Sequence, residues 1–132
     1  MNSQVVLDFV DAINRADVDK MYELMTDDPI FVDSRDTVTS GKENLKQAWI
    51  GYFDLFPDYK IEITEMLEKE SILGMYGYAS GTSKNLKDEN NTHHWRIPAA
   101  WTVIIKNNRV KKWQVYADNS VVLDIINNNI NS

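Results

Sequence analysis

Two aspartates in this sequence stand at the ends of apolar runs, where a carboxylate can do acid/base chemistry. Asp33 follows the apolar residues 30–32, and Asp118 follows the run that begins at Trp113. A carboxylate at the mouth of an apolar pocket can take up and release protons near neutral pH. Each aspartate also has a simpler interpretation, since Asp33 suits a turn and Asp118 suits the cap of a helix. Both interpretations stay open, and both residues are candidate catalytic groups.

A histidine and an arginine beside the polar segment 83–93 add hydrogen-bond donors and positive charge. His94 and Arg96 fall on the same face of a predicted strand, where they can orient an anionic or enolic substrate. His94 is therefore a third candidate catalytic residue. The adjacent His93 and His94 lack a third ligand at suitable spacing, so we predict no metal site.

The common cofactor and nucleophile motifs are missing from the sequence. It has no Gly-rich phosphate loop, no G-x-S-x-G elbow, no HExxH and no cysteine. If the protein is an enzyme, we expect it to work without a cofactor.

Large aromatic side chains are numerous for 132 residues, with four Trp, six Tyr and four Phe. Singly, such residues more often belong to a core or a dimer contact, but together they fit a pocket for a flat, apolar ligand. The candidate substrate-binding residues are Phe9, Trp49, Phe53, Trp95, Arg96, Trp101, Trp113 and Tyr116.

The charge and hydropathy of the chain limit its partners. A formal net charge of −6, spread along the chain, argues against nucleic acid, which needs a clustered basic face. No apolar stretch reaches the ~18 residues of a membrane span. The first apolar run contains Asp8 and Asp11 without a basic region before it, which is unlike a secretory signal. We expect a cytoplasmic protein whose partner is a small apolar molecule.

The N-terminal half of the chain has the apolar spacing of helices. Asp17 is placed to cap the second helix, and Pro29 to stop it after two turn residues. Gly41 separates a short strand from the third helix, which carries a broad aromatic face. The predicted segments are helices at about 5–15, 18–25 and 45–56, with a strand at 30–33.

The C-terminal half has the patterns of strands. A period of two begins near residue 59, and segment 72–82 is apolar on both faces, with glycines that indicate bending or close backbone approach. The pair Asn107–Asn108 predicts a tight hairpin turn with positive φ. A short helix is expected near residues 122–126, followed by a frayed tail at 127–132. Helices first and strands later predict one α+β domain over residues 1–132.

Strand alternation raises a question about Asp118. In a regular strand, Tyr116 and Asp118 share one face, whereas Trp113, Val115 and Ala117 share the other. If the Trp113 face lines the pocket, Asp118 turns inward only through a bulge or at the end of the strand. The sequence leaves both arrangements open.

The order of these elements, together with the closing string KKWQVYADN, resembles the SnoaL-like families of the nuclear transport factor 2-like superfamily. The resemblance implies a cone-shaped fold, in which three N-terminal helices pack on a strongly curved, mostly antiparallel sheet and enclose an apolar pocket. It also implies a homodimer that pairs through the outer sheet face. The apolar residues on both faces of segment 72–82 favour such a pairing.

In two stretches the resemblance extends to individual residues. The stretch TDDPIFVDS places Asp33 where ketosteroid isomerases keep their general-base carboxylate. The stretch WQVYADN places Asp118 where SnoaL-type polyketide cyclases keep an acid/base aspartate. The two oxyanion donors of the isomerases correspond here to Phe9 and Ala100, which cannot donate hydrogen bonds.

Two functional hypotheses follow. The first is a cofactor-free isomerase, cyclase or dehydratase acting on a small apolar carbonyl compound. The second is a non-catalytic ligand-binding or dimerisation module of the same fold, which the missing oxyanion donors favour.

Overall fold

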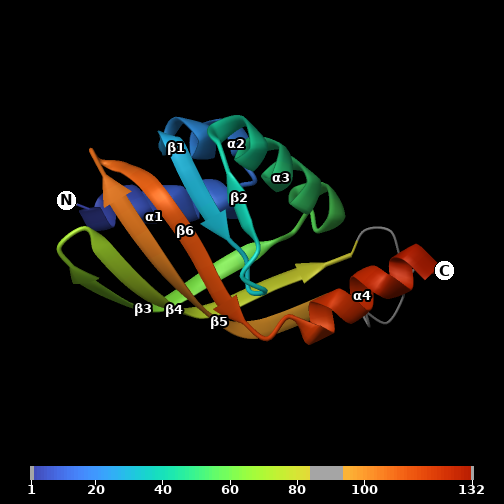
Figure 1. Ribbon diagram of the computed structural model, residues 1–132. Helices are drawn as coiled ribbons and strands as arrows, with labels where there is room; N and C mark the ends of the chain where they lie inside the picture. Colours follow the sequence, from blue (N-terminus) through green and yellow to red (C-terminus); the bar gives the residue numbers. More distant parts are fainter. Residues whose placement is uncertain (1, 84–93, 132) are drawn as a thin grey trace.

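The computed structural model describes residues 2–83 and 94–131, with the side chains of residues 127–131 left out, and its α+β class is the predicted one (Figure 1). Of the predicted polar loop 83–93, only Ser83 lies within the described residues. The helices are α1 (Asn2–Asn14), α2 (Val18–Glu23), α3 (Lys42–Leu55) and α4 (Ser120–Asn131). The strands are β1 (Met25–Val32), β2 (Val38–Ser40), β3 (Lys60–Lys69), β4 (Ile72–Thr82), β5 (His94–Lys106) and β6 (Arg109–Ala117).

The six strands form one open, curved sheet in the order β2-β1-β6-β5-β4-β3. All neighbouring strands are antiparallel except β1 and β6, which run parallel. Helices α1, α2 and α3 lie on the inner side of the curve, and α4 projects from the end of β6 (Figure 1). None of the helices that the structure describes is long and apolar enough to cross a membrane.

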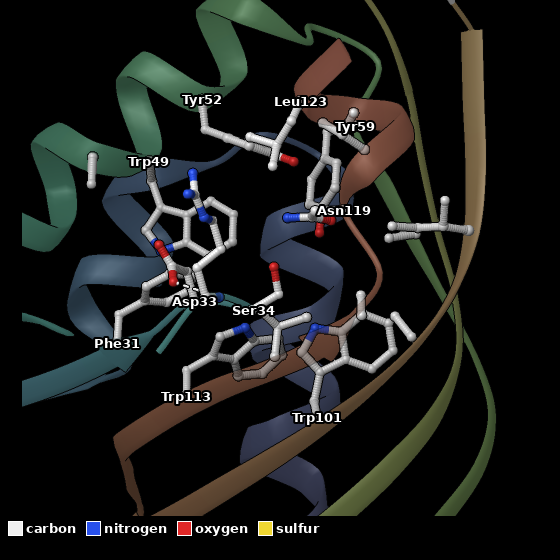
Figure 2. Close-up of a pocket in the computed structure, with 18 of the residues that line it drawn as sticks. Phe31, Asp33, Ser34, Trp49, Tyr52, Tyr59, Trp101, Trp113, Asn119 and Leu123 are labelled. Atoms are coloured by element: carbon white, nitrogen blue, oxygen red, sulfur yellow. Dashed lines mark hydrogen bonds between the residues drawn. The ribbon is translucent and has the colours of Figure 1, made fainter. Parts of the chain in front are cut away.

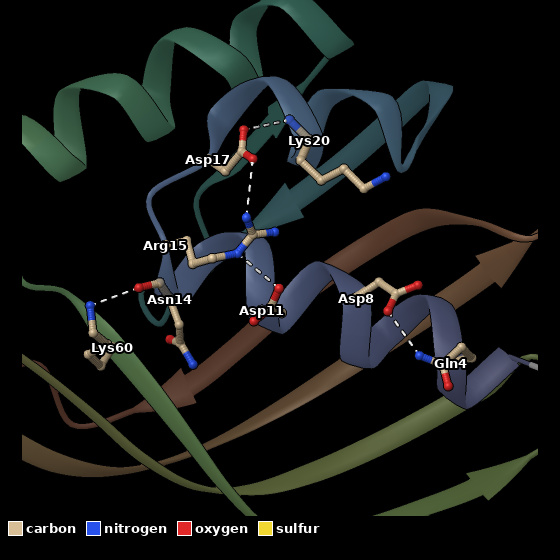
Figure 3. A network of polar contacts seen from close by, with 8 residues as sticks. All are labelled: Gln4, Asp8, Asp11, Asn14, Arg15, Asp17, Lys20 and Lys60. Atoms are coloured by element: carbon tan, nitrogen blue, oxygen red, sulfur yellow. Dashed lines mark hydrogen bonds and ion pairs between the residues drawn. The ribbon is translucent and has the colours of Figure 1, made fainter.

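Helix α1 supplies the base of the core. One side of it buries an apolar stripe that includes Phe9, while the other side carries exposed polar contacts such as Gln4 to Asp8 (Figure 3). At its end, the side chain of Asn14 donates to the carbonyl of Ile61 at 3.0 Å and accepts from the N–H of the same residue at 2.8 Å. These two bonds fasten the C-terminus of α1 to β3.

The boundary between α2 and β1 differs from the prediction. Asp17 does cap α2, accepting from the N–H of Lys20 at 3.1 Å, but the helix ends at Glu23 and β1 already begins at Met25. Parallel pairing of Met25 with Val110 draws this segment into the sheet. Pro29 lies where the register shifts between residues 25 and 30, so its missing N–H costs no ladder bond. Strand β2, which was not predicted, pairs with the end of β1.

The turn prediction is confirmed, and Gly77 shows the close backbone approach predicted for the glycines of β4. Asn107 and Asn108 have φ of 52° and 63°, as a tight hairpin turn between β5 and β6 requires. At Gly77, a Cβ would overlap the carbonyl oxygen of Glu62 on the neighbouring strand. The same region holds an irregularity in register between Ile63 and Glu65, which shifts the alternation of β3.

Candidate functional site

A cavity of about 370 Å³ lies between the inner face of the sheet and helices α3 and α4 (Figure 2). Its floor consists of inward-facing residues of β5 and β6, which alternate with outward-facing ones along each strand. The lining residues are Phe31, Asp33, Ser34, Arg35, Thr39, Leu45, Ala48, Trp49, Tyr52, Tyr59, Ala79, Trp95, Ile97, Ala99, Trp101, Trp113, Val115, Ala117, Asn119, Val122, Leu123 and Ile126.

The walls of the cavity are mainly aromatic. Trp49 of α3 is edge-on to Phe31 at 5.7 Å and to Tyr52 at 6.2 Å between ring centroids. Trp101 and Trp113 tilt against each other on the floor at 6.5 Å. Broad apolar faces of this kind suit a flat ligand. Four of the predicted substrate-binding residues, Trp49, Trp95, Trp101 and Trp113, line the cavity.

Asp33 lies beside the cavity, directly after β1. Its Oδ1 accepts from the N–H groups of Arg35 and Thr37, both at 2.9 Å, in the turn that the alternative interpretation predicted. Within residues 2–83 and 94–126, no side chain pairs with Oδ2. The turn therefore holds the carboxylate by one oxygen and leaves the other available to a ligand.

Asp118 lies outside the cavity. The Trp113, Val115 and Ala117 face of β6 lines the pocket, and no bulge at the end of the strand turns Asp118 inward. Its Oδ1 instead accepts from the N–H of Ser120, the first residue of α4, at 3.0 Å, while the carbonyl of Asn119 accepts the first bond of the helix. The hydrogen bonds from Ser120 hold the pKa of Asp118 below its usual 3.8. The neighbouring Asn119 enters the cavity lining in its place.

Three further predicted residues lie on the outer face or at the edge of the sheet and do not line the cavity. His94 contacts the hydroxyl of Thr82 through Nδ1 at 2.7 Å. Arg96 pairs with Glu62 at 3.2 Å and covers the ring of Tyr78. Tyr116 is 47% exposed on the outer face. Alternation along β5 and β6 directs these side chains away from the cavity.

The remaining predicted aromatics support the cavity from behind. Phe9 packs on Trp113 at 5.0 Å between centroids, and Phe53 stacks on Trp49 at 5.5 Å. Both are buried, but neither contributes to the lining. Ala100, the other position aligned with an oxyanion donor, pairs with Tyr116 on the outer face, while Ala99 and Trp101 face inward.

Two tyrosines in the lining were not among the predicted site residues. Tyr52 of α3 and Tyr59, which precedes β3, meet edge to face at 4.9 Å. Burial raises the pKa of both hydroxyls above 10.0, and Tyr52 adds to the effect at Tyr59. Both therefore stay neutral and able to donate. Tyr52 belongs to the aromatic face that the sequence predicts for the third helix, whereas Tyr59 was interpreted as the first residue of a strand.

Several polar groups in the cavity wall have no partner within the described part of the chain. The hydroxyls of Ser34, Tyr52 and Tyr59 and the amide of Asn119 donate no hydrogen bond to any residue that the structure describes. A ligand with hydrogen-bond acceptors would satisfy them. Among the described residues, no group of three or more His, Asp or Glu side chains is arranged to hold a metal ion.

Comparisons with known proteins agree with this architecture. A family model described as a SnoaL-like domain matches residues 6–113. No curated protein matches the chain in sequence.

Solved structures share the fold at low sequence identity. A protein of ketosteroid isomerase-like fold from Catenulispora acidiphila DSM 44928, solved with trimethylamine, has a TM-score of 0.79 and 16% identity, covering 91% of this chain and 89% of its own. A structure from Shewanella denitrificans OS-217 that carries the name SnoaL-like polyketide cyclase has a TM-score of 0.79 and 17% identity, over 96% and 97%. An NTF2-like protein of Burkholderia pseudomallei K96243 has a TM-score of 0.79 and 14% identity, over 95% and 96%.

Proposed function

Because the chain belongs to the SnoaL-like domain family, we propose that it binds a flat, largely apolar carbonyl compound in the cavity beneath α3. The observation that carries this proposal is the cavity itself. Its volume of about 370 Å³ falls in the range of small-molecule sites, and its walls are aromatic with a few unpartnered polar groups. Such a lining favours an apolar ring system that carries one or two acceptor oxygens.

The carboxylate of Asp33 supports a catalytic form of this proposal. Oδ1 is fixed by two backbone N–H groups, and Oδ2 has no partner among the described residues. In a carbonyl compound seated in the cavity, Oδ2 removes a proton from the carbon next to the carbonyl, and an enolate forms. The same carboxyl then returns the proton to a carbon of the enolate, so no cofactor is required. His94 and Asp118, the other predicted catalytic residues, lie outside the lining.

The test measures proton abstraction without knowledge of the natural substrate. 1-Tetralone in D₂O exchanges the protons next to its carbonyl slowly, and proton NMR follows the loss of their signal. We expect the wild-type protein to accelerate this exchange, and Asp33→Asn to reduce the acceleration by about 100-fold or more. Binding of 1-tetralone should change little, because asparagine keeps the oxygen that accepts from the turn.

Asp118→Asn is the matched control for this experiment. It makes the same chemical change at a carboxylate outside the cavity, and asparagine keeps the oxygen that accepts from Ser120. The exchange rate should stay at the wild-type level. Equal exchange in wild type and Asp33→Asn would contradict the catalytic role of Asp33.

The second candidate function is non-catalytic binding. It is favoured by the charge of the lining, since Asp33 is the one acidic residue among the lining residues that the structure describes. Acid/base enzymes often pair two titratable groups with different tasks, whereas a binding module needs no such pair. Tight binding of 1-tetralone without any acceleration of exchange would support this function instead.

We also propose that the protein forms a homodimer through the outer sheet face. Tyr76, Ala100 and Tyr116 lie in one row across β4, β5 and β6, because Ala100 pairs with both tyrosines. Tyr76 is 45% exposed, and Leu67 and Ile72 on the same face are 66% and 50% exposed. Exposed apolar side chains gathered on one sheet face favour a protein partner. The cytoplasmic location expected from the sequence stays a prediction.

A further inference from the structure

Two tryptophans on neighbouring strands share the floor of the cavity. Trp101 of β5 is paired with Val115, and Trp113 of β6 with Val103, so the two indoles are diagonal neighbours on the inner face. Their ring centroids are 6.5 Å apart, and their planes differ by 48°. The sheet thus fixes the two rings relative to each other, because each stands on a strand within a continuous ladder.

The indole N–H groups of this pair lie on the cavity side of their rings and have no hydrogen-bond partner among the described residues. Trp101 and Trp113 are only 2% and 4% exposed, and neither donates a hydrogen bond to a residue in the described parts of the chain. Trp95 differs, because its Nε1 is wholly enclosed and has no partner. The other two nitrogens are not enclosed in this way, and both tryptophans line the cavity. Figure 2 shows both on the side of their rings that faces Ser34.

An N–H group in an apolar wall is poorly hydrated. A hydrogen bond to a ligand acceptor therefore contributes more binding free energy there than it would at an exposed N–H group. Two such donors on rigid neighbouring strands are preorganised, because neither side chain must be ordered when a ligand arrives. Their chemistry matches an oxygen with two lone pairs, such as a ketone or an enolate, and not a hydrocarbon edge.

We infer that Trp101 and Trp113 form a paired indole donor site that binds the carbonyl oxygen of the ligand. In this chain the two tryptophans donate the hydrogen bonds to the oxygen, because Phe9 and Ala100 at the positions of the isomerase donors cannot. The inference rests on the proposed function, because it assigns the polar end of the ligand within the same cavity. It makes the two tryptophans specificity-determining residues, which select a ring compound that carries an acceptor oxygen over the same ring without it.

The experiment compares 1-tetralone with tetralin, which has the same ring system but no carbonyl. Calorimetric titration should show that the wild-type protein prefers 1-tetralone by about 10-fold. Trp101→Phe and Trp113→Phe should each lose most of this preference while still binding tetralin. Tyr116→Phe is the control, since it removes a hydrogen-bond donor from an aromatic ring on the outer face of the sheet, outside the cavity lining. It should keep the preference.

A second readout needs no variant and therefore does not depend on whether the variants fold. In the ¹H–¹⁵N spectrum of the wild-type protein, two of the four indole N–H signals should move downfield with 1-tetralone and stay in place with tetralin. Equal affinity for the two compounds, with no such shift, would overturn the inference and leave the proposed binding function standing. Failure of both compounds to bind would overturn the two together.

Discussion

The two aspartates show how strongly the role of a residue depends on its exact position after the end of a strand. Asp33 and Asp118 both follow apolar strands, and both accept backbone N–H bonds from residues just after them. Asp33 nevertheless borders the cavity, whereas Asp118 lies outside the lining, just before α4. The proposed proton-transfer role therefore rests on Asp33, and Asn119 contributes a polar group to the cavity lining.

The buried tyrosines give a pH prediction at the scale of single residues. Because burial raises the pKa of Tyr59 and Tyr52 in the folded state, their contribution to stability is complete below pH 10 and is lost as the pH rises beyond it. Thermal unfolding between pH 8 and 11 should show a steep fall in melting temperature for the wild type. Tyr59→Phe should change stability little at pH 8 and weaken the alkaline fall.

The control for this prediction is Tyr22→Phe, since Tyr22 is a partly exposed tyrosine of α2, away from the outer face of the sheet. This variant should follow the wild-type pH profile. An alkaline profile that is identical in wild type and Tyr59→Phe would show that Tyr59 is not the group that titrates.

At the scale of elements, the curvature that opens the cavity depends on close approach between β3 and β4. The irregularity between Ile63 and Glu65 lies opposite Gly77, where the two backbones come too close for any side chain. Bulges and glycines of this kind bend a sheet, and a bent sheet leaves room between its inner face and the helices.

Gly77→Ala tests this close approach. The added Cβ would overlap the carbonyl oxygen of Glu62, so the backbone must shift. We expect a loss of at least about 2 kcal/mol in the free energy of unfolding, measured by urea denaturation. Gly51→Ala is the control, because Gly51 lies in α3, where an added Cβ would have no neighbour within 4 Å apart from the local helix backbone and the adjacent residues. It should stabilise the protein by about 0.5–1 kcal/mol. Similar effects at both glycines would contradict the close packing of β3 on β4.

At the scale of the whole molecule, the two faces of the sheet differ in what covers them. The inner face carries the core and the cavity, while the outer face has no helix on it in Figure 1. Two tyrosines and two aliphatic side chains remain exposed on the outer face: Tyr76, Tyr116, Leu67 and Ile72. The proposed dimer would cover them.

Sedimentation velocity tests the dimer. The wild-type protein should sediment with twice the chain mass of 15.3 kDa, and the double variant Tyr76→Lys with Tyr116→Lys should sediment as a monomer. Two lysines on each copy would place like charges against each other in the centre of the interface. Leu7→Lys is the control, since Leu7 is 46% exposed on α1, away from the outer face. A wild-type monomer at all concentrations would refute the dimer.

Local patterns in the sequence predicted most of the elements. Helical spacing located α1 and α3, the Asn107–Asn108 pair located the hairpin turn, and β4 has the predicted bounds. These features depend on neighbours within a few residues, so the sequence expresses them directly. The start of β1 and the whole of β2 were missed, because both depend on pairing with distant strands. Pairing partners do not appear in a local pattern.

What the sequence by itself determined is the fold class, the aromatic character of the pocket and the candidate carboxylate at Asp33. Only the tertiary structure decided which side of β5 and β6 faces the cavity, and with it the positions of Asp118, His94, Arg96 and Tyr116 outside the lining. The physical reason is that alternation along a strand defines two faces but does not say which one the helices cover. That choice is made by packing across the whole sheet, which also brought Tyr59 and Asn119 to the cavity.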